Sequence, residues 1–182
     1  MRPSAFNQIQ TALVERKLIR LFHRFEENSV NGYVVAVSSS YFVVALVCDR
    51  IRFDGFECFR IKDLISIENN PNRNFVESAL KKRGLRRARA PRLVLTNVKS
   101  ILSTIGAKYP LVTIQREEVA PGICHIGKVV ATNRTQVALL EISPAATWDT
   151  RATAYSLREI TRIGFGGAYE EALQLVGGAG DV

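Results

Sequence analysis

The chain has 182 residues, of which 47% are hydrophobic and 23% charged, values typical of a folded globular protein rather than a disordered one. No apolar run approaches the roughly 20 residues of a membrane-spanning helix, and the polar first residues lack the core of a signal peptide. We therefore expect a cytoplasmic protein with no membrane partner. The three cysteines form no CxxC pair, and their odd number argues against a disulfide framework.

The positive charge is concentrated in one short stretch. Residues 1–80 carry a net charge of +1 and residues 93–182 a net charge of zero, although the whole chain has +8. The basic segment, residues 81–92, supplies the remaining +7 without a single acid. Its cations are Lys81, Lys82, Arg83, Arg86, Arg87, Arg89 and Arg92.

The chain repeats one pattern after 93 to 96 residues. Gly32 opens an apolar run that contains Val34-Val35-Ala36, and Gly127 opens a second run with Val129-Val130-Ala131. Solenoid repeats are shorter, about 20 to 50 residues, so this period indicates two domains of one type. We predict a first domain at 1–84, a basic linker at 85–92 and a second domain at 93–182.

Periodicity predicts the same elements in both copies, in chain order. The first has a helix near 5–16, strands at 18–23, 32–37, 41–47 and 64–67, and a helix through 75–80 that ends at Gly84. The Asp54-Gly55 pair predicts a hairpin with arms at 50–53 and 56–61. The second has a helix over 98–105, strands at 111–115, 127–132 and 136–142, and a closing helix over 168–176 before a frayed glycine tail at 177–180. Residues 143–150 are interpreted as an insertion that replaces the hairpin.

A helix followed by five short strands, of which the second and third are bent, resembles the Sm-like fold. Residues 5–68, and more faintly 97–165, are similar to the bacterial hexameric RNA chaperone of that superfamily. The resemblance implies a mainly β protein with two tandem Sm-like five-stranded antiparallel barrels, each with a short leading and a short trailing helix. It also implies RNA as a partner and self-association through the edge strands of the barrels.

The sequence departs from that family where the family binds uridine. A Tyr-Lys-His run holds the base in the chaperone, whereas Ile61-Lys62-Asp63 and Leu157-Arg158-Glu159 occupy the matching positions here. An acid therefore replaces the histidine in both copies, and an acid repels phosphate. Asp63 and Glu159 are interpreted as turn-capping residues rather than as a catalytic pair.

Signals of enzymatic chemistry are nearly absent from the sequence. His23 and His125 lack the spaced Cys, Asp or Glu partners of a metal site, so we assign both a structural role. Cys48 and Cys58 are interpreted as small apolar strand residues. The glycines of 164–167 favour a strand-to-helix turn because no Lys-Ser/Thr of a nucleotide loop follows. We therefore predict no enzyme, no catalytic residues, no metal, no cofactor and no small-molecule substrate.

The basic segment leaves several functions open. Its cations can neutralise phosphates in weak, salt-sensitive and sequence-independent binding of RNA or another nucleic acid. A solvated linker without a ligand explains the same charges, and an acidic protein or a membrane surface is a further partner class. The segment contains no aromatic residue that could stack on bases. The hypotheses are a nucleic-acid-binding module whose site is the seven cations, or a module for protein–protein interaction or assembly.

Overall fold

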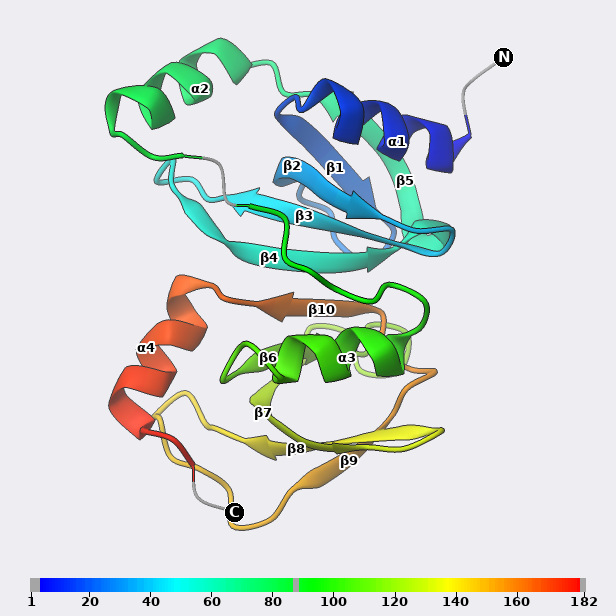
Figure 1. The fold of residues 1–182 in the computed structure, drawn as a ribbon, viewed down its shortest axis with the longest axis vertical. Helices are drawn as coiled ribbons and strands as arrows, with labels where there is room; N and C mark the ends of the chain where they lie inside the picture. The colour runs from blue at the N-terminus through cyan, green and yellow to red at the C-terminus, as the bar shows by residue number, and fades with distance from the viewer. Residues whose placement is uncertain (1–3, 87–88, 181–182) are drawn as a thin grey trace. The chain divides into compact units, whose positions relative to one another are not determined.

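The computed structural model describes residues 4–86 and 89–180 (Figure 1). Internal contacts divide the chain into two compact units, Met1–Pro91 and Arg92–Val182. Within the described residues, all strand pairs of both units are antiparallel, which makes the protein mainly β with helices at the ends of each copy. None of these helices combines the length and apolar composition that crossing a membrane requires.

The first unit follows the predicted order of elements. Ser4 caps its first helix, because the Ser4 side chain accepts a hydrogen bond from the backbone N–H of Asn7. The elements are α1 (Ala5–Glu15), β1 (Ile19–His23), β2 (Val30–Val37), β3 (Tyr41–Val47), β4 (Phe53–Arg60), the single turn η1 (Ile61–Asp63), β5 (Leu64–Asn69) and α2 (Arg73–Lys82). The predicted C-terminal glycine of α2, Gly84, has a φ of +68°, as expected of a helix end.

The second unit repeats this order. Asn97 caps α3, because its side chain accepts a hydrogen bond from the backbone N–H of Ser100. The elements are α3 (Val98–Gly106), β6 (Val112–Gln115), β7 (Cys124–Thr132), β8 (Gln136–Glu141), β9 (Thr153–Ser156), β10 (Arg162–Phe165) and α4 (Ala168–Gly177). Strand β9, which the sequence does not reveal, takes the place of β4.

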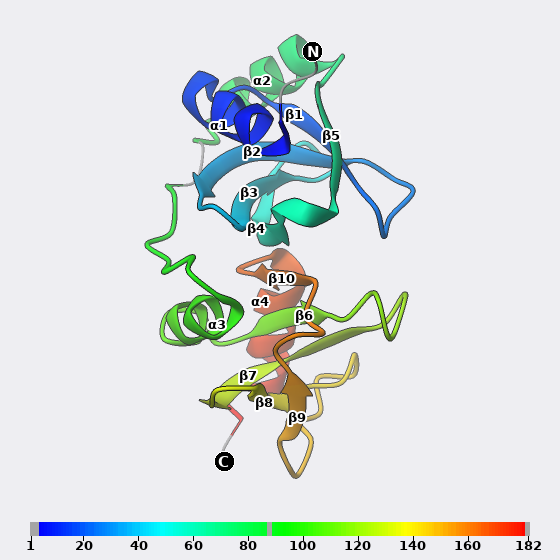
Figure 2. The same cartoon turned by 90° about the vertical axis from the view of Figure 1, so that its right-hand side faces the viewer.

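The two sheets have the same strand order. It is β5-β1-β2-β3-β4 in the first unit and β10-β6-β7-β8-β9 in the second. The leading helix of each unit lies on its sheet: α1 contacts β2 and β5, and α3 contacts β7 and β8 (Figures 1 and 2). The strand order puts β4 and β5 at opposite ends of the first sheet, so the hydrogen bonds between the described residues do not close a barrel within that unit.

A close backbone approach recurs at the two glycines that open the repeat. Gly32 pairs with Leu46, and Gly127 pairs with Glu141. A Cβ atom at Gly32 would lie 2.4 Å from the carbonyl oxygen of Ala45, and a Cβ at Gly127 would lie 2.3 Å from that of Leu140. Only glycine allows the strands to meet this closely.

A register shift follows at the same distance in both copies. It lies between Val34 and Ala36 in β2 and between Val129 and Ala131 in β7. An extra residue of this kind bends a strand and increases its twist. The bent second and third strands predicted from the sequence therefore have the same physical origin twice.

The predicted hairpin at Asp54-Gly55 is wrong. Both residues lie inside β4, where Gly55 has a φ of +71° and the register against β3 shifts between Ala45 and Val47. A glycine with positive φ serves a bulge here instead of a turn. The turn lies earlier, at 48–52, where the backbone N–H of Cys48 donates to the carbonyl of Arg52.

The proposed insertion at 143–150 is the same turn in the second copy. Ser143 donates its backbone N–H to Thr147, as Cys48 does to Arg52. Ile51 and Ala146, one in each turn, have positive φ angles of 54° and 57°. The glycine tail is not frayed as far as Gly180, because the backbone of Gly180 packs against the Trp148 ring and Trp148 Nε1 donates to the carbonyl of Gly177.

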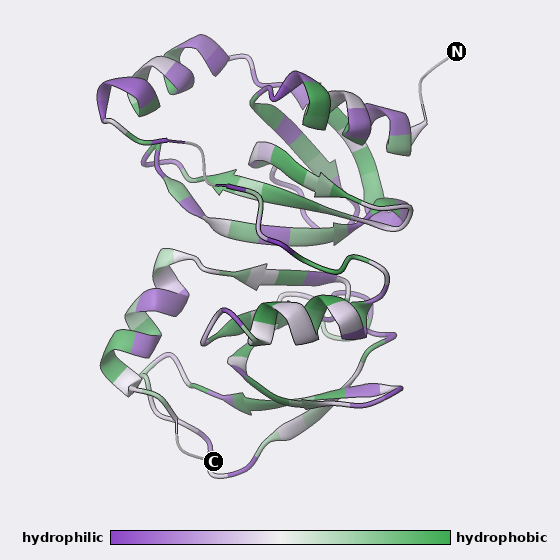
Figure 3. Cartoon of the chain, viewed as in Figure 1, coloured by the Kyte–Doolittle hydropathy of each residue, from purple (hydrophilic) through white to green (hydrophobic). Residues whose placement is uncertain are grey.

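Hydrophobic side chains fill both faces of the central strands. On one face of the first sheet, Ile9 and Ala12 of α1 pack with Val34, Phe42 and other strand residues. On the other face, Leu80 of α2 packs with a second cluster whose further buried members are Leu18, Tyr33 and Val47. Figure 3 shows β2 and β3 as mainly hydrophobic and α2 as mainly hydrophilic. Burial on both faces explains the nearly continuous apolar runs.

Replacing either repeat glycine by alanine will destabilise the unit that contains it. Gly32→Ala and Gly127→Ala each force a Cβ against a backbone oxygen, and overpacking of this kind costs about 1–3 kcal/mol or more. Urea unfolding monitored by circular dichroism measures the loss. Gly164→Ala is the matched control, because a Cβ there meets its nearest atom at 3.4 Å. Equal losses in all three variants would contradict the role of the close approach.

Candidate nucleic-acid interface

The predicted basic segment is exposed where the structure describes it. Arg87 lies outside the described residues. The other six cations have exposed side chains: Lys81, Lys82, Arg83, Arg86, Arg89 and Arg92. Lys81 and Lys82 belong to the last turn of α2, where a cation also stabilises the negative end of the helix dipole.

One of the six cations has a structural task. Arg83 Nη1 donates hydrogen bonds to the carbonyl oxygens of Arg50 and Ile51, at 2.6 and 2.9 Å. This contact ties the end of α2 to the turn at 48–52, where Ile51 holds its positive φ. Arg83 therefore stabilises the fold, and its guanidinium is less available to an external anion.

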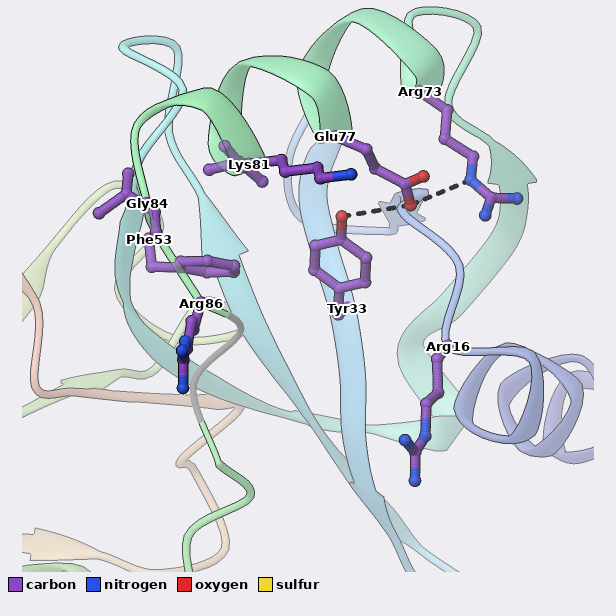
Figure 4. A pocket seen from close by; sticks show the side chains of 10 residues that line it. Arg16, Tyr33, Phe53, Arg73, Glu77, Lys81, Gly84 and Arg86 are labelled. Carbon is purple, nitrogen blue, oxygen red and sulfur yellow. Dashed lines mark hydrogen bonds and ion pairs between the residues drawn. The ribbon is translucent and has the colours of Figure 1, made fainter.

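Two of the cations, Lys81 and Arg86, line a pocket of about 450 Å³ in the first unit. We call it the basic pocket (Figure 4). Its lining joins α2 and the residues after it to the end of α1 and to strands β2 and β4. The lining residues are Arg16, Tyr33, Phe53, Arg73, Glu77, Leu80, Lys81, Gly84, Leu85 and Arg86.

The single carboxylate of the basic pocket is already engaged by protein groups. Glu77 Oε1 accepts hydrogen bonds from Arg73 Nε at 3.0 Å and from the Tyr33 hydroxyl at 3.4 Å. Figure 4 draws both contacts on the floor beneath α2. Because four cations face one carboxylate, the pocket keeps a positive charge that suits an anion.

Arg16 connects the basic pocket to a second hollow. This hollow has a volume of about 760 Å³, and its charged lining residues are Arg16, Arg89 and Glu15. Arg16 itself has a φ of +50°, a left-handed conformation that helix ends usually assign to glycine or asparagine. The cations thus follow one surface of the first unit from Lys81 to Arg89.

The second unit lacks these cations at the equivalent positions. The hydrophobic clusters that include α2 and α4 contain equivalent residues in the two units. Leu80 corresponds to Leu173, Val47 to Ile142, and Leu18 to Leu111. In this register Tyr109, Gly166 and Gln174 stand where the first unit has Arg16, Arg73 and Lys81. The same fold therefore forms without the cations, and packing does not require them.

The sequence prediction missed the part of this site that lies outside the basic segment. Tyr33 and Phe53 come from strands, and Arg16 and Arg73 lie at the ends of α1 and α2. The positive charge of Arg16, at the end of a predicted helix, was visible as a signal. The fold supplies the aromatic residue that the basic segment lacks, because the Phe53 ring lines the pocket 6.2 Å from the buried Tyr33 ring.

His23 has surroundings that fit a structural role. Only 3% of its surface is exposed, and its Nε2 atom lies 3.1 Å from Glu26 Oε2. Its ring lies against Phe59, with 5.4 Å between centroids. These contacts enclose the imidazole between a carboxylate and an aromatic ring.

His125 belongs to a polar network inside the second sheet. Its Nδ1 atom lies 2.8 Å from the Tyr155 hydroxyl and 3.1 Å from Glu141 Oε2. The Tyr155 hydroxyl also donates to Glu141 Oε1. Burial, followed by the hydrogen bond and the negative charge of Glu141, raises the pKa of Tyr155 above its usual value. A tyrosine with a raised pKa stays protonated, so its hydroxyl donates a hydrogen bond but gives up its proton with difficulty.

Strand register matches this network to an apolar cluster in the first unit. Val30, Leu46 and Phe59 hold the positions of His125, Glu141 and Tyr155, and all three pack in the core beneath α1. The second unit thus has three polar residues where the equivalent core of the first unit has three apolar ones. His125 Nε2 is buried, which keeps it from an external substrate.

The two acids at the histidine position of the resembled family bind arginines. Asp63, only 4% exposed, forms ion pairs with Arg60 and with Arg24 Nε at 3.3 Å. Glu159 Oε2 accepts a hydrogen bond from Arg116 Nη1 at 2.8 Å. Each carboxylate is therefore neutralised by a partner within its own unit.

The remaining candidate residues lie apart from the basic pocket. All three cysteines are free thiols, and burial raises the pKa of Cys58 to about 12. The glycines at 164–167 end β10 and lead into α4, as the predicted strand-to-helix turn. Among the described residues, no group of three or more His, Cys, Asp or Glu side chains is placed to hold a metal ion.

Comparison with known proteins identifies no relative. No family model, no curated protein sequence and no solved structure matches the chain.

The polar network predicts that a triple variant that removes the whole network is more stable than the single variant Glu141→Leu. Glu141→Leu removes the carboxylate that both the Tyr155 hydroxyl and His125 Nδ1 contact and leaves them only each other as partners, which costs about 1–3 kcal/mol. The triple variant His125→Val, Glu141→Leu, Tyr155→Phe installs the apolar set of the first unit and is expected to cost less, because no buried polar group is orphaned. Urea unfolding compares the two. A triple variant less stable than Glu141→Leu would refute the equivalence of the two cores.

Proposed function

We propose that the protein is a non-catalytic RNA-binding module, and that the cations around the basic pocket neutralise RNA phosphates. The strongest support is that the cations around the basic pocket occur in only one of the two equivalent units. A duplicated fold that forms without these charges gains no packing from them, so a partner of opposite charge accounts for them best.

Each unit is proposed to be an Sm-like fold. Support comes from a leading helix, five antiparallel strands in the same order, and a glycine and a register shift that bend β2 and β7 at equivalent positions. The uridine pocket of the resembled chaperone has no counterpart in the proposal, because Asp63 is engaged in a buried ion pair with Arg60 and in a second pair with the more exposed Arg24. RNA contact is instead assigned to the surface beside α2.

The cations outside the basic pocket are expected to set the salt dependence of RNA binding. The triple variant Lys82→Gln, Arg89→Gln, Arg92→Gln removes three phosphate contacts. We expect about tenfold weaker binding to single-stranded RNA at low salt, and a slope of log affinity against log salt that is shallower by about 2. Fluorescence anisotropy of a labelled oligonucleotide at several salt concentrations measures both.

A matched control removes the same net charge at arginines outside the basic segment. Arg134, Arg151 and Arg158 are also exposed, and Arg134→Gln, Arg151→Gln, Arg158→Gln should leave RNA affinity within about twofold of the parent protein. Equal losses in the two triple variants would show that net charge alone attracts the RNA. Absence of binding by the parent protein at low salt would overturn the proposed function.

An assembly module is the second candidate, supported by an apolar side chain on a sheet edge. Strand β5 pairs with β1 and ends the first sheet, and its Ile65 is 66% exposed. An edge strand with an exposed apolar residue can pair with another chain.

Charge placed on this edge should prevent such pairing. If β5 mediates assembly, light scattering will give the parent protein a mass above the 20.3 kDa of one chain, and Ile65→Lys will restore one-chain mass. Val14→Lys, at an exposed apolar position of α1, is the control that should leave the mass unchanged. A parent protein that remains a monomer at all concentrations would exclude this candidate.

A further inference from the structure

The basic pocket pairs its cations with an accessible aromatic side chain. Phe53 lines the pocket and is half-buried, whereas Tyr33 is only 3% exposed and serves as part of the floor. In the view of Figure 4, the Phe53 ring lies between the Lys81 and Arg86 side chains. An aromatic ring flanked by cations offers a flat apolar surface and an anion site to the same ligand.

The equivalent aromatic residue of the second unit is also half-buried, but the end of the chain packs against its ring. Trp148 holds the position of Phe53, since Ile142 bridges to Trp148 as Val47 pairs with Phe53. The backbone of Gly180 packs on the Trp148 ring, and Lys128 Nζ donates to the carbonyl of Gly180 at 3.3 Å. In that unit the chain itself fills the space beside the ring.

The first unit leaves this space as a pocket. Leu85 packs into the trailing-helix core, and Arg86 then lines the opening beside Phe53. The pocket volume of about 450 Å³ lies within the range of about 300–1,000 Å³ that holds small ligands. Hence one copy of the fold fills the position with its own tail, and the other keeps it open and positively charged.

We propose that the basic pocket binds one nucleoside monophosphate unit, with the base on Phe53 and the phosphate at the neighbouring Lys81 and Arg86 side chains. The inference rests on the proposed RNA-binding function, which it refines from phosphate neutralisation along a surface to recognition of a single nucleotide. The unit is supplied either by an RNA strand or by a free nucleotide, and both present the same phosphate and base.

Isothermal titration calorimetry with 5′-AMP, adenosine and inorganic phosphate tests the ligand class. We expect 5′-AMP to bind at least about tenfold more tightly than either fragment, because only the complete nucleotide uses both the ring and the cations. Affinity for 5′-AMP no greater than that for phosphate would overturn the proposal.

Variants separate the two halves of the pocket. Phe53→Leu should weaken 5′-AMP about tenfold and leave phosphate binding unchanged, and Phe53→Tyr, which keeps the ring, should restore 5′-AMP binding. Lys81→Gln with Arg86→Gln, at exposed positions, should weaken both 5′-AMP and phosphate. Arg134→Gln with Arg151→Gln is the control of equal charge. If Phe53→Leu does not fold, the Lys81 and Arg86 pair still decides whether the pocket holds the phosphate.

Competition with RNA identifies the source and keeps this proposal distinct from the RNA function. Displacement of 5′-AMP by a single-stranded oligonucleotide means that RNA supplies the nucleotide, and 5′-AMP binding that RNA leaves unaffected assigns the pocket to a free nucleotide. RNA binding that depends on Lys82, Arg89 and Arg92 without any 5′-AMP binding would refute the pocket alone. Binding of 5′-AMP by a protein that does not bind RNA would refute the RNA function alone.

Discussion

The contact between the backbone at Gly32 and the carbonyl of Ala45 is the constraint on which the first unit depends. It brings β2 and β3 closer than any side chain would allow, and the register shift that follows bends both strands. Because side chains alternate between the two faces of a strand, consecutive residues of β2 enter different cores, Tyr33 beneath α2 and Val34 beneath α1. The two helices cover opposite faces of this bent sheet, and the second unit repeats the arrangement from Gly127. The basic pocket exists because Tyr33 is turned toward α2.

Much of this architecture could be predicted from the sequence, because the repeat preserves the residues that impose backbone geometry. The glycines, the Val-Val-Ala runs and the helix caps Ser4 and Asn97 act locally, so their effect can be inferred without a structure. The prediction of the hairpin failed because its outcome depends on pairing with a neighbouring strand and not on local residues alone. The pair Asp54-Gly55 forms a hairpin turn only where the residues on its two sides do not pair with the same neighbouring strand. Here β3 pairs with β4 residues on both sides of it. The actual turn places Ile51 at positive φ, which a β-branched residue rarely adopts and no sequence pattern indicates.

The candidate site could be predicted only for its charges. The basic segment is visible because its cations are neighbours in the sequence, but a pocket requires groups that tertiary structure brings together. Phe53 reaches the site because β4 runs antiparallel to β3, and Arg16 because α1 ends beside β2. Conversely, Arg83 looks like any other cation of the segment, yet its hydrogen bonds to the turn at 48–52 give it a structural task. The sequence shows how many charges are present, whereas the fold decides which of them face a ligand.

Because the chain contains two copies of one fold, a comparison of equivalent positions shows which residues the fold requires and which can vary. The positions of Val30, Leu46 and Phe59 accept either an apolar cluster or the His125 network, so the core beneath the leading helix constrains shape more than chemistry. The position of Phe53 likewise accepts an aromatic ring that lines a pocket or one that packs against the backbone of Gly180. Neither exchange disturbs the glycine contact, because that contact lies in the backbone. Side chains beside the trailing helix are therefore free to differ between the copies, and the cations gathered there in the first unit are the clearest difference.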